Sequence, residues 1–279
     1  MVGSTFKRIN VEQIKNLVIP WAPLPEQTAI ATALSDVDAL ISGLDRCIAK
    51  KRDIKQAAMQ NLLTGKIRLP GFNGEWRTFA IKEIFNFIQS SNHPREKLTD
   101  FGDVEYIHYG DIHTNPKTLF DKSTDKFPSI NSNLVKDIPR LKEGDLIMVD
   151  ASEDYSALGK SIELKNVGSS DIVAGLHTLV LRGNSNLIAN SFKQYLQNIC
   201  HFKSELIKIA TGISVYGISK SNLSNIQITI PPLPEQTAIA TVLSDMDAEI
   251  SAFEKRREKT IHLKQGMMQE LLTGRIRLA

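Results

Sequence analysis

Three side chains in the middle of the chain, Asp150, Glu163 and Lys165, have the types and spacing of a metal-dependent nuclease site. In such a site, two carboxylates hold a divalent ion and the lysine steadies the attacking hydroxide. The spacing is loose, so a nuclease is one hypothesis among others for this chain.

Other catalytic and metal-binding patterns fit the sequence less well. A methyltransferase that acts on amines needs an Asn/Asp-Pro-Pro-aromatic motif, and Asn92-His-Pro-Arg95 does not supply one. The six histidines lack ligand spacing, and Cys47 and Cys200 are too few for a disulfide framework. We therefore predict no zinc site and a reducing, cytoplasmic location. No stretch approaches the roughly 18 apolar residues of a membrane span, so we expect no membrane partner.

An internal repeat organises the elements that would position any site. Pro23-Leu-Pro-Glu-Gln-Thr-Ala-Ile-Ala-Thr32 recurs 209 residues later, from Pro232 to Thr241. Over the 47 positions from Pro23 to Leu69, 29 are identical to their counterparts in the second copy. Two such copies that frame an unrepeated middle indicate paired structural elements.

Each copy predicts one long helix. Pro25 and Pro234 suit the first turn, where a missing N–H has no cost, and Gly65 and Gly274 suit the left-handed position after the last turn. A helix over 26–64 would be about 58 Å long. This is far longer than an ordinary globular helix, so we expect two arms that pair with each other.

Apolar residues in both copies follow the alternating steps of four and three that form a coiled-coil seam. Because the middle segment connects the end of one helix to the start of the other, we expect an antiparallel pair within one chain. The alternative is pairing between two chains, which gives a symmetric homodimer. The predicted seam sets Ile30, Leu34, Val37, Ile41 and Leu44 against Ile239, Leu243, Met246, Ile250 and Phe253.

Charge is distributed unevenly between the repeats and the middle. Residues 70–231 hold 17 Lys and Arg and 18 Asp and Glu, a balance of −1. The repeats instead carry basic clusters around Lys50-Lys51-Arg52 and Lys255-Arg256-Arg257. These clusters are either a solvated face or a surface for acidic partner subunits or the DNA backbone.

The middle segment combines predicted strands and a helix. Residues 104–108, 146–149 and 177–181 have strand composition, and residues 190–209 have helical spacing. The segment before each long helix also repeats, and Ile14–Ile19 aligns with Leu223–Ile228 as a short strand. We divide the chain into residues 1–22, the tail of an otherwise absent domain, then 23–69, 70–231 and 232–279.

Together these motifs resemble the DNA specificity subunit of type I restriction–modification systems. The resemblance rests on Pro231-Pro-Leu-Pro-Glu-Gln236, on helices that end in Leu-Leu-Thr-Gly, on a domain that opens at Trp76, and on Tyr106-Ile-His-Tyr-Gly-Asp-Ile112 and Glu143-Gly-Asp-Leu-Ile147. It implies an α+β fold, with a mixed α/β target recognition domain attached to an antiparallel pair of long coiled-coil helices. The family has two recognition domains, and this sequence has one, as in a truncated subunit.

The resemblance also implies a non-catalytic protein that reads one half of a bipartite site in double-stranded DNA. Its partners would be modification subunits, which bind S-adenosylmethionine, and a restriction subunit. No cofactor or metal is then expected in this chain. Base edges are read by donors and acceptors on exposed loops. The predicted DNA-binding residues are His93, Arg95, His108, Tyr109, His113, Asn115, Lys117, Ser152, Tyr155, Ser156, Lys160, Ser214, Tyr216, Lys220 and Ser221.

A further alternative is a coiled-coil interaction module whose middle domain binds protein. The near-neutral charge of residues 70–231 favours this alternative, because a nucleic-acid binder usually has a basic surface.

Overall fold

The computed structural model describes residues 10–19, 21–154 and 157–278. These residues form two compact units. One unit contains the described residues up to Asp53 and from Asp247 onward, and the other contains Ile54–Met246. The predicted domain boundaries at residues 22, 69 and 231 remain predictions.

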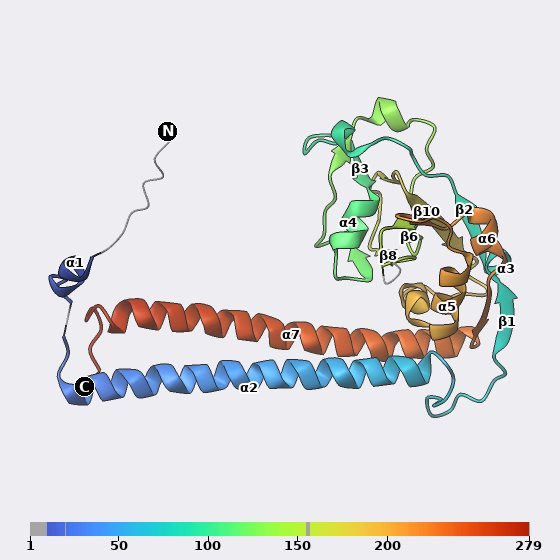
Figure 1. The fold of residues 1–279 in the computed structure, drawn as a ribbon. Helices are drawn as coiled ribbons and strands as arrows, with labels where there is room; N and C mark the ends of the chain where they lie inside the picture. Colours follow the sequence, from blue (N-terminus) through green and yellow to red (C-terminus); the bar gives the residue numbers. More distant parts are fainter. Residues whose placement is uncertain (1–9, 20, 155–156, 279) are drawn as a thin grey trace. The chain divides into compact units, whose positions relative to one another are not determined.

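The two repeats form long helices, as predicted. Helix α2 spans Leu24–Leu62 and helix α7 spans Leu233–Leu271, each with 39 residues (Figure 1). Gly65 and Gly274 follow them with φ angles of 69° and 71°. This left-handed conformation is favourable for glycine and ends both helices.

Ion pairs across the first unit establish that α2 and α7 are antiparallel. Lys264 Nζ lies 2.6 Å from Asp38 Oδ1, Arg257 pairs with Asp45, and Lys51 Nζ lies 2.6 Å from Glu249 Oε1. The residue numbers rise along α2 as they fall along α7, so the helices run in opposite directions. Members of the basic clusters therefore pair across the two helices, at positions where the apolar seam is interrupted.

The predicted pairing along the seam is wrong in its partners. Since the helices are antiparallel, residues near the start of one helix face the end of the other. Ile30 lines the same hollow as Leu271, and Ile239 packs in one cluster with Leu62. Ile30, Leu44, Ile239, Leu243 and Ile250 are buried, and Leu34, Val37, Ile41, Met246 and Phe253 are partly buried.

The short strand predicted at Ile14–Ile19 does not form. Helix α1 spans Val11–Lys15 and is capped by the Asn10 side chain, and the residues after it are neither helix nor strand. The second copy has the corresponding helix α6 (Lys220–Asn225), followed by strand β12 (Gln227–Ile230). Strand β12 pairs with β1 (Arg77–Ala80), and within the described residues the first copy has no equivalent of β1.

The second unit is a mixed α/β domain. Its five-stranded sheet has the order β2 (Phe85–Ile88), β10 (Thr178–Gly183), β6 (Leu146–Val149), β8 (Ser161–Lys165) and β4 (Leu119–Asp121). All its neighbours are antiparallel except β4 and β8. A second sheet has the order β5 (Ser129–Ile130), β3 (Val104–Ile107) and β9 (Ile172–Ala174). A two-stranded pair joins β7 (Ala151–Ser152) to β11 (Tyr216–Gly217).

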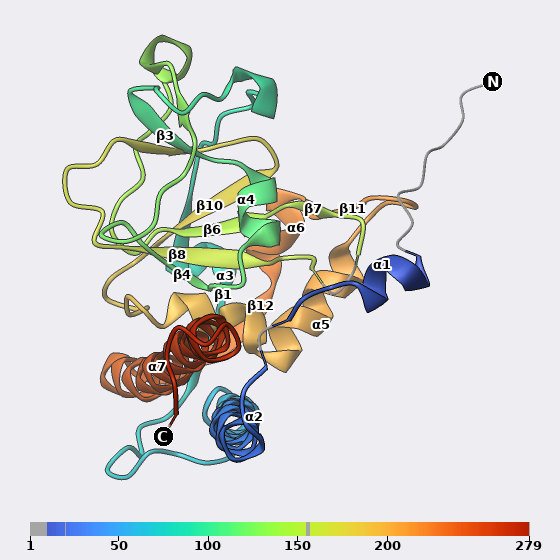
Figure 2. The ribbon, with the colours of Figure 1, turned by 90° about the vertical axis from the view of Figure 1, so that its left-hand side faces the viewer.

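Short helices surround these sheets. Helices α3 (Ile81–Ile84), α4 (Tyr109–Thr114) and α5 (Cys200–Ile209) accompany three 3₁₀ segments, Arg95–Lys97, Ser132–Val135 and Lys193–Asn198. Helix α5 packs beside α6 and β12 (Figure 2). The single helix predicted over residues 190–209 is thus broken at Ile199, whose extended backbone starts α5.

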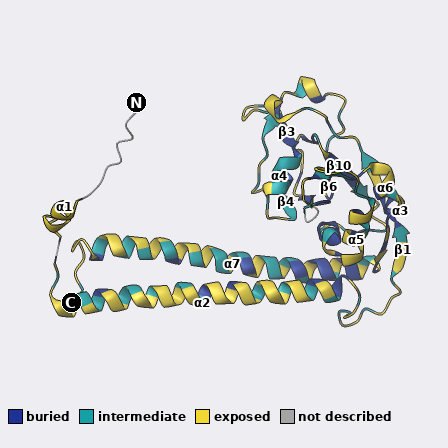
Figure 3. Ribbon diagram, in the orientation of Figure 1, coloured by how far each residue is buried: buried dark blue, intermediate teal, exposed yellow. Residues whose placement is uncertain are grey.

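The five-stranded sheet is apolar on both faces, as its strand β6 shows. Leu146 and Met148 belong to one buried cluster, and Ile147 and Val149 belong to another. Alternate side chains of a strand point to opposite faces, so both faces of this sheet are covered (Figure 3). Within the described segments, no helix has the length and hydropathy needed to span a bilayer.

Candidate nucleic-acid interface

A hollow of about 430 Å³ in the second unit gathers several of the predicted DNA-binding residues. Helix α4, strand β7 with the loop after it, and the turn before β10 supply its walls. Its lining residues are Tyr109, His113, Ala151, Ser152, Glu153, Asp154, Ala157, His177 and Val215.

Helix α4 presents an aromatic group to this hollow. His108 caps the helix, since its ring Nδ1 accepts a hydrogen bond from the Gly110 N–H at 3.3 Å. Burial lowers the pKa of His108, so its ring favours the neutral form that can accept this bond. The Tyr109 ring meets His113 and His177 edge-on, with centroids 6.0 and 5.4 Å away.

The β7–β11 pair brings a distant loop to the same place. Ser152 lies opposite Tyr216, and Thr211 and Gly217 exchange hydrogen bonds of 3.0 and 2.7 Å that close the loop between them. Gly212 has a φ of 133°, and a Cβ there would lie 1.9 Å from the Val215 carbonyl oxygen. The tight turn therefore requires glycine, and it exposes the loop tip, which includes Ser214.

Two predicted cations support α4. Lys160 Nζ donates to the His113 carbonyl at 2.7 Å, and burial lowers the Lys160 pKa. Arg95 donates to Asp111 Oδ1 at 2.9 Å near the start of α4. Both side chains thus fix the helix that carries Tyr109.

Other predicted residues have different contacts and do not line the hollow. The His93 ring lies 2.9 Å from the Leu134 carbonyl, and Lys117 forms an ion pair with Asp125. Lys220 Nζ lies 5.1 Å from the centre of the Phe87 ring. Asn115 accepts from the Lys117 N–H, and Ser221 lies in α6. Tyr155 and Ser156 lie outside the described residues. DNA contact by all these residues stays a prediction.

Sequence reasoning missed His177, which lines this hollow, and assigned Asp150 to a metal-dependent nuclease site. His177 Nδ1 lies 3.2 Å from Asp150 Oδ1. Burial raises the pKa of Asp150, and His177 opposes that shift. Thr178 pairs with Val149 in adjacent antiparallel strands, so the residues just beyond them also meet, and this register is not visible in the sequence.

The nuclease hypothesis is not supported by the geometry of its carboxylates. Glu163 is buried, and it accepts hydrogen bonds from the N–H groups of Ser191 and Gln194 at 2.6 and 3.0 Å. Asp150 is engaged with His177 instead. The described residues contain no group of three or more His, Cys, Asp or Glu side chains that could hold a metal.

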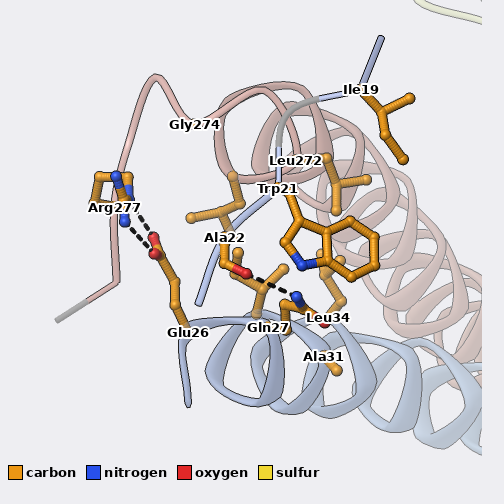
Figure 4. A pocket seen from close by; sticks show the side chains of 12 residues that line it. Ile19, Trp21, Ala22, Glu26, Gln27, Ala31, Leu34, Leu272, Gly274 and Arg277 are labelled. Atoms are coloured by element: carbon orange, nitrogen blue, oxygen red, sulfur yellow. Dashed lines mark hydrogen bonds and ion pairs between the residues drawn. The ribbon is translucent and has the colours of Figure 1, made fainter. Parts of the chain in front are cut away.

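A second hollow, of about 450 Å³, lies in the first unit at the start of α2 and the end of α7. Trp21, Ile30, Leu34 and Leu272 contribute apolar surface to it (Figure 4). Trp21 is 78% exposed. At its rim, Gln27 Nε2 donates to the Ala22 carbonyl at 2.7 Å, as Figure 4 shows.

The sequence matches the family of type I restriction–modification DNA specificity domains over residues 1–50 and 73–263. The chain belongs to this family. Its antiparallel helices and mixed α/β unit are the architecture that the sequence resemblance predicted.

Individual relatives agree with this assignment. The chain is 26% identical over 275 residues to a putative type I restriction enzyme MjaX specificity subunit of Methanocaldococcus jannaschii, covering 97% of this chain and 62% of that protein. It is 27% identical to the MjaVIII specificity subunit of the same organism, covering 99% of this chain and 66% of that protein. The chain thus spans just under two thirds of these relatives.

Solved structures show the same fold. The HsdS subunit from Thermoanaerobacter tengcongensis superposes with a TM-score of 0.51 at 18% identity, covering 99% of this chain and 65% of that one. A type I restriction–modification S subunit from M. genitalium gives a TM-score of 0.55 at 16% identity, covering 97% and 67%.

Proposed function

We propose that this chain recognises DNA sequence for a type I restriction–modification complex and performs no catalytic step itself. The observation that carries the proposal is the hollow beside α4. There, an aromatic ring, two imidazoles and a hydroxyl meet on segments that are far apart in sequence. Side chains of these types can both donate to and accept from base edges. Family membership supports the same function.

The single recognition domain would read one half of a bipartite target. Methylation would then be carried out by modification subunits that bind S-adenosylmethionine, and a restriction subunit would complete the complex. The chain's own cations do not favour tight DNA binding alone, since Arg95, Lys117 and Arg140 are engaged with carboxylates. Partner subunits would supply much of the contact with the phosphate backbone.

We further propose that the helix pair docks the modification subunits. Its exposed cations provide support for this proposal. Lys50, Lys255, Arg256 and Lys259 are exposed and have no ion pair with other described residues. An acidic partner surface or DNA phosphates would complement them.

The hollow at the start of α2 supports docking of a second copy of this chain. At the equivalent position in the second unit, Gln236 Nε2 donates to the Leu187 carbonyl at 2.9 Å, and Gln236 Oε1 accepts from the Ala189 N–H at 2.8 Å. Gln27 is the repeat of Gln236, yet within the described residues its side-chain oxygen accepts no hydrogen bond. A second copy that offers a hydrogen-bond donor to Gln27 and an apolar surface to Leu272 would complete this position. Light scattering should then show a dimer, which Gln27→Ala weakens.

The competing function, a protein-binding module, is favoured by the balance of −1 in residues 70–231. Selection of duplexes from a randomised DNA library by the full chain, with and without modification subunits, separates the two. The proposal predicts one enriched motif in both samples, with stronger retention when modification subunits are present. Retention without any preferred motif in either sample would contradict it.

A further inference from the structure

His177 has a backbone conformation that is uncommon for its residue type. Its φ is 57°, in the left-handed region, and it immediately precedes β10. A non-glycine residue keeps this conformation where its surroundings fix it, and such residues concentrate at functional sites. Here the His177 carbonyl accepts a hydrogen bond from the Asp150 N–H at 3.2 Å, which holds the turn in place.

Asp150 also determines which ring nitrogen of His177 carries the proton. Its carboxylate oxygen lies 3.2 Å from Nδ1, and an ionised carboxylate can only accept a hydrogen bond. In the neutral ring, the proton is therefore on Nδ1, and Nε2 has a free lone pair. Asp150 is itself tied to the loop after α5, since its carbonyl accepts from the Ile218 N–H at 2.7 Å.

The ring of His177 is placed for contact with a ligand. Its side chain is 49% exposed and lines the hollow, and the edge-on Tyr109 ring, 5.4 Å away at 87°, limits its rotation. The described polar groups around it are mainly acceptors, because Glu153 and Asp154 share the wall. An acceptor-rich wall suits the amino groups of DNA bases better than their carbonyl groups.

We propose that His177 is a specificity-determining residue whose Nε2 accepts a hydrogen bond from an exocyclic amino group of a base, and that Asp150 is its positioning residue. In the major groove, adenine N6 and cytosine N4 are such groups, whereas guanine O6 and thymine O4 are acceptors. One position of the recognised half-site is then A or C on the contacted strand. This inference rests on the proposed function, because it requires the hollow to face DNA.

Selection from a randomised duplex library with the full chain and its variants tests the inference. His177→Asn tolerates the left-handed backbone but lacks Nε2, so it should reduce discrimination at one position by roughly three- to tenfold. Asp150→Asn can donate to Nδ1 and so favours a proton on Nε2. It should move the preference at that position from A or C toward G or T. Asp171→Asn, which alters an exposed carboxylate paired with Arg140, should change neither the discrimination nor the preferred base at that position.

The ring protonation gives a second readout that does not depend on DNA. Nitrogen NMR of the full chain should find the neutral His177 ring protonated on Nδ1, and on Nε2 in Asp150→Asn. A wild-type motif that is unchanged at every position in both variants overturns the inference and leaves the proposed function intact. A wild-type ring protonated on Nε2 also overturns it. If the wild-type chain selects no motif, the proposed function itself fails.

Discussion

Arg277 and Glu26 form a bidentate ion pair at the start of α2, with N–O distances of 2.6 and 2.5 Å. Arg68 and Glu235 are the counterparts of Arg277 and Glu26 at the repeat shift of 209, and they form an ion pair of the same kind. Glu235 also accepts a hydrogen bond from Trp76 Nε1 at 3.2 Å, whereas Glu26 is hydrogen-bonded by the backbone of Leu278 instead. The two pairs thus share their chemistry and differ in what covers them.

This difference predicts unequal effects of matched substitutions. Arg68→Ala should lower the melting temperature more than Arg277→Ala, because the Arg68–Glu235 pair is the more buried one: its side chains are 28% and 1% exposed, against 64% and 8% for Arg277 and Glu26. Arg275→Ala, which removes a side chain that is 63% exposed, is the control and should have little effect. Equal losses for Arg68→Ala and Arg277→Ala in thermal melts would contradict the comparison.

The Arg277 pair should also respond to pH. Hydrogen bonding to Arg277 lowers the pKa of Glu26 from 4.5. The pair therefore stabilises the fold above about pH 4.5, and this contribution is lost as the pH falls. Urea unfolding should find that wild type and Arg277→Ala converge in acid. A difference that persists unchanged at low pH would count against the ion pair as its cause.

The helix pair offers an internal test of its buried seam. Leu44 is 5% exposed and Leu40 is 44% exposed on the same helix. Leu44→Ala should lower the free energy of unfolding by about 2–4 kcal/mol, because it removes buried methyl groups and leaves a cavity. Leu40→Ala should cost less than about 1 kcal/mol, as measured by chemical denaturation. Similar costs at both positions would mean that α2 does not bury this face.

The sequence was sufficient to predict the helices, because the repeat gave their limits and the Pro and Gly residues gave their ends. It did not predict the seam partners, because the same heptad spacing fits several registers. The ion pairs of Asp38 and Asp45 determine the register, and they depend on both helices at once. The strand predicted at Ile14–Ile19 does not form for a similar reason, since a strand needs a hydrogen-bonding partner that local sequence cannot supply.

The site was predicted only in part. Tyr109, His113 and Ser152 do line the hollow, although Tyr109 and His113 lie in helix α4 and not on an exposed loop as predicted. His177 was missed because its place in the hollow depends on its position opposite Asp150 across two strands. Arg95 and Lys160 hydrogen-bond to α4, which the sequence did not predict, and their contact with DNA stays a prediction.

The buried carboxyl group of Glu163 predicts a second pH dependence of stability, opposite in sign to that of the Arg277–Glu26 pair. Burial raises its pKa from 4.5 to about 7 despite the nearby Lys193. The folded protein therefore binds more protons than the unfolded chain between these values, so stability falls as the pH rises from about 4.5 to about 7. Denaturation across this range should show the decline in wild type and a flatter profile in Glu163→Gln. Parallel profiles would show that Glu163 is ionised in the folded state throughout.

DNA binding by the isolated chain should be weak and only mildly salt-dependent. The cations of the second unit are balanced by carboxylates, so few counterions are released. If Lys220 holds a phosphate, Lys220→Ala should reduce the slope of log affinity against log salt by about 1. Lys208→Ala, whose lysine pairs with Glu205, serves as the control. Tight and steeply salt-dependent binding in fluorescence titrations would contradict this account.

Site-specific photocrosslinking tests most directly whether the hollow beside α4 faces DNA. A photoreactive residue at Val215, which is 50% exposed and lines the hollow, is compared with one at Leu134, which is 44% exposed and does not line it. The full chain is crosslinked to the duplex selected from the randomised library. The account predicts that Val215 crosslinks to bases within the selected motif and that Leu134 crosslinks weakly or outside it. Crosslinks from Leu134 within the motif, together with none from Val215, would place the DNA on another surface and contradict the account.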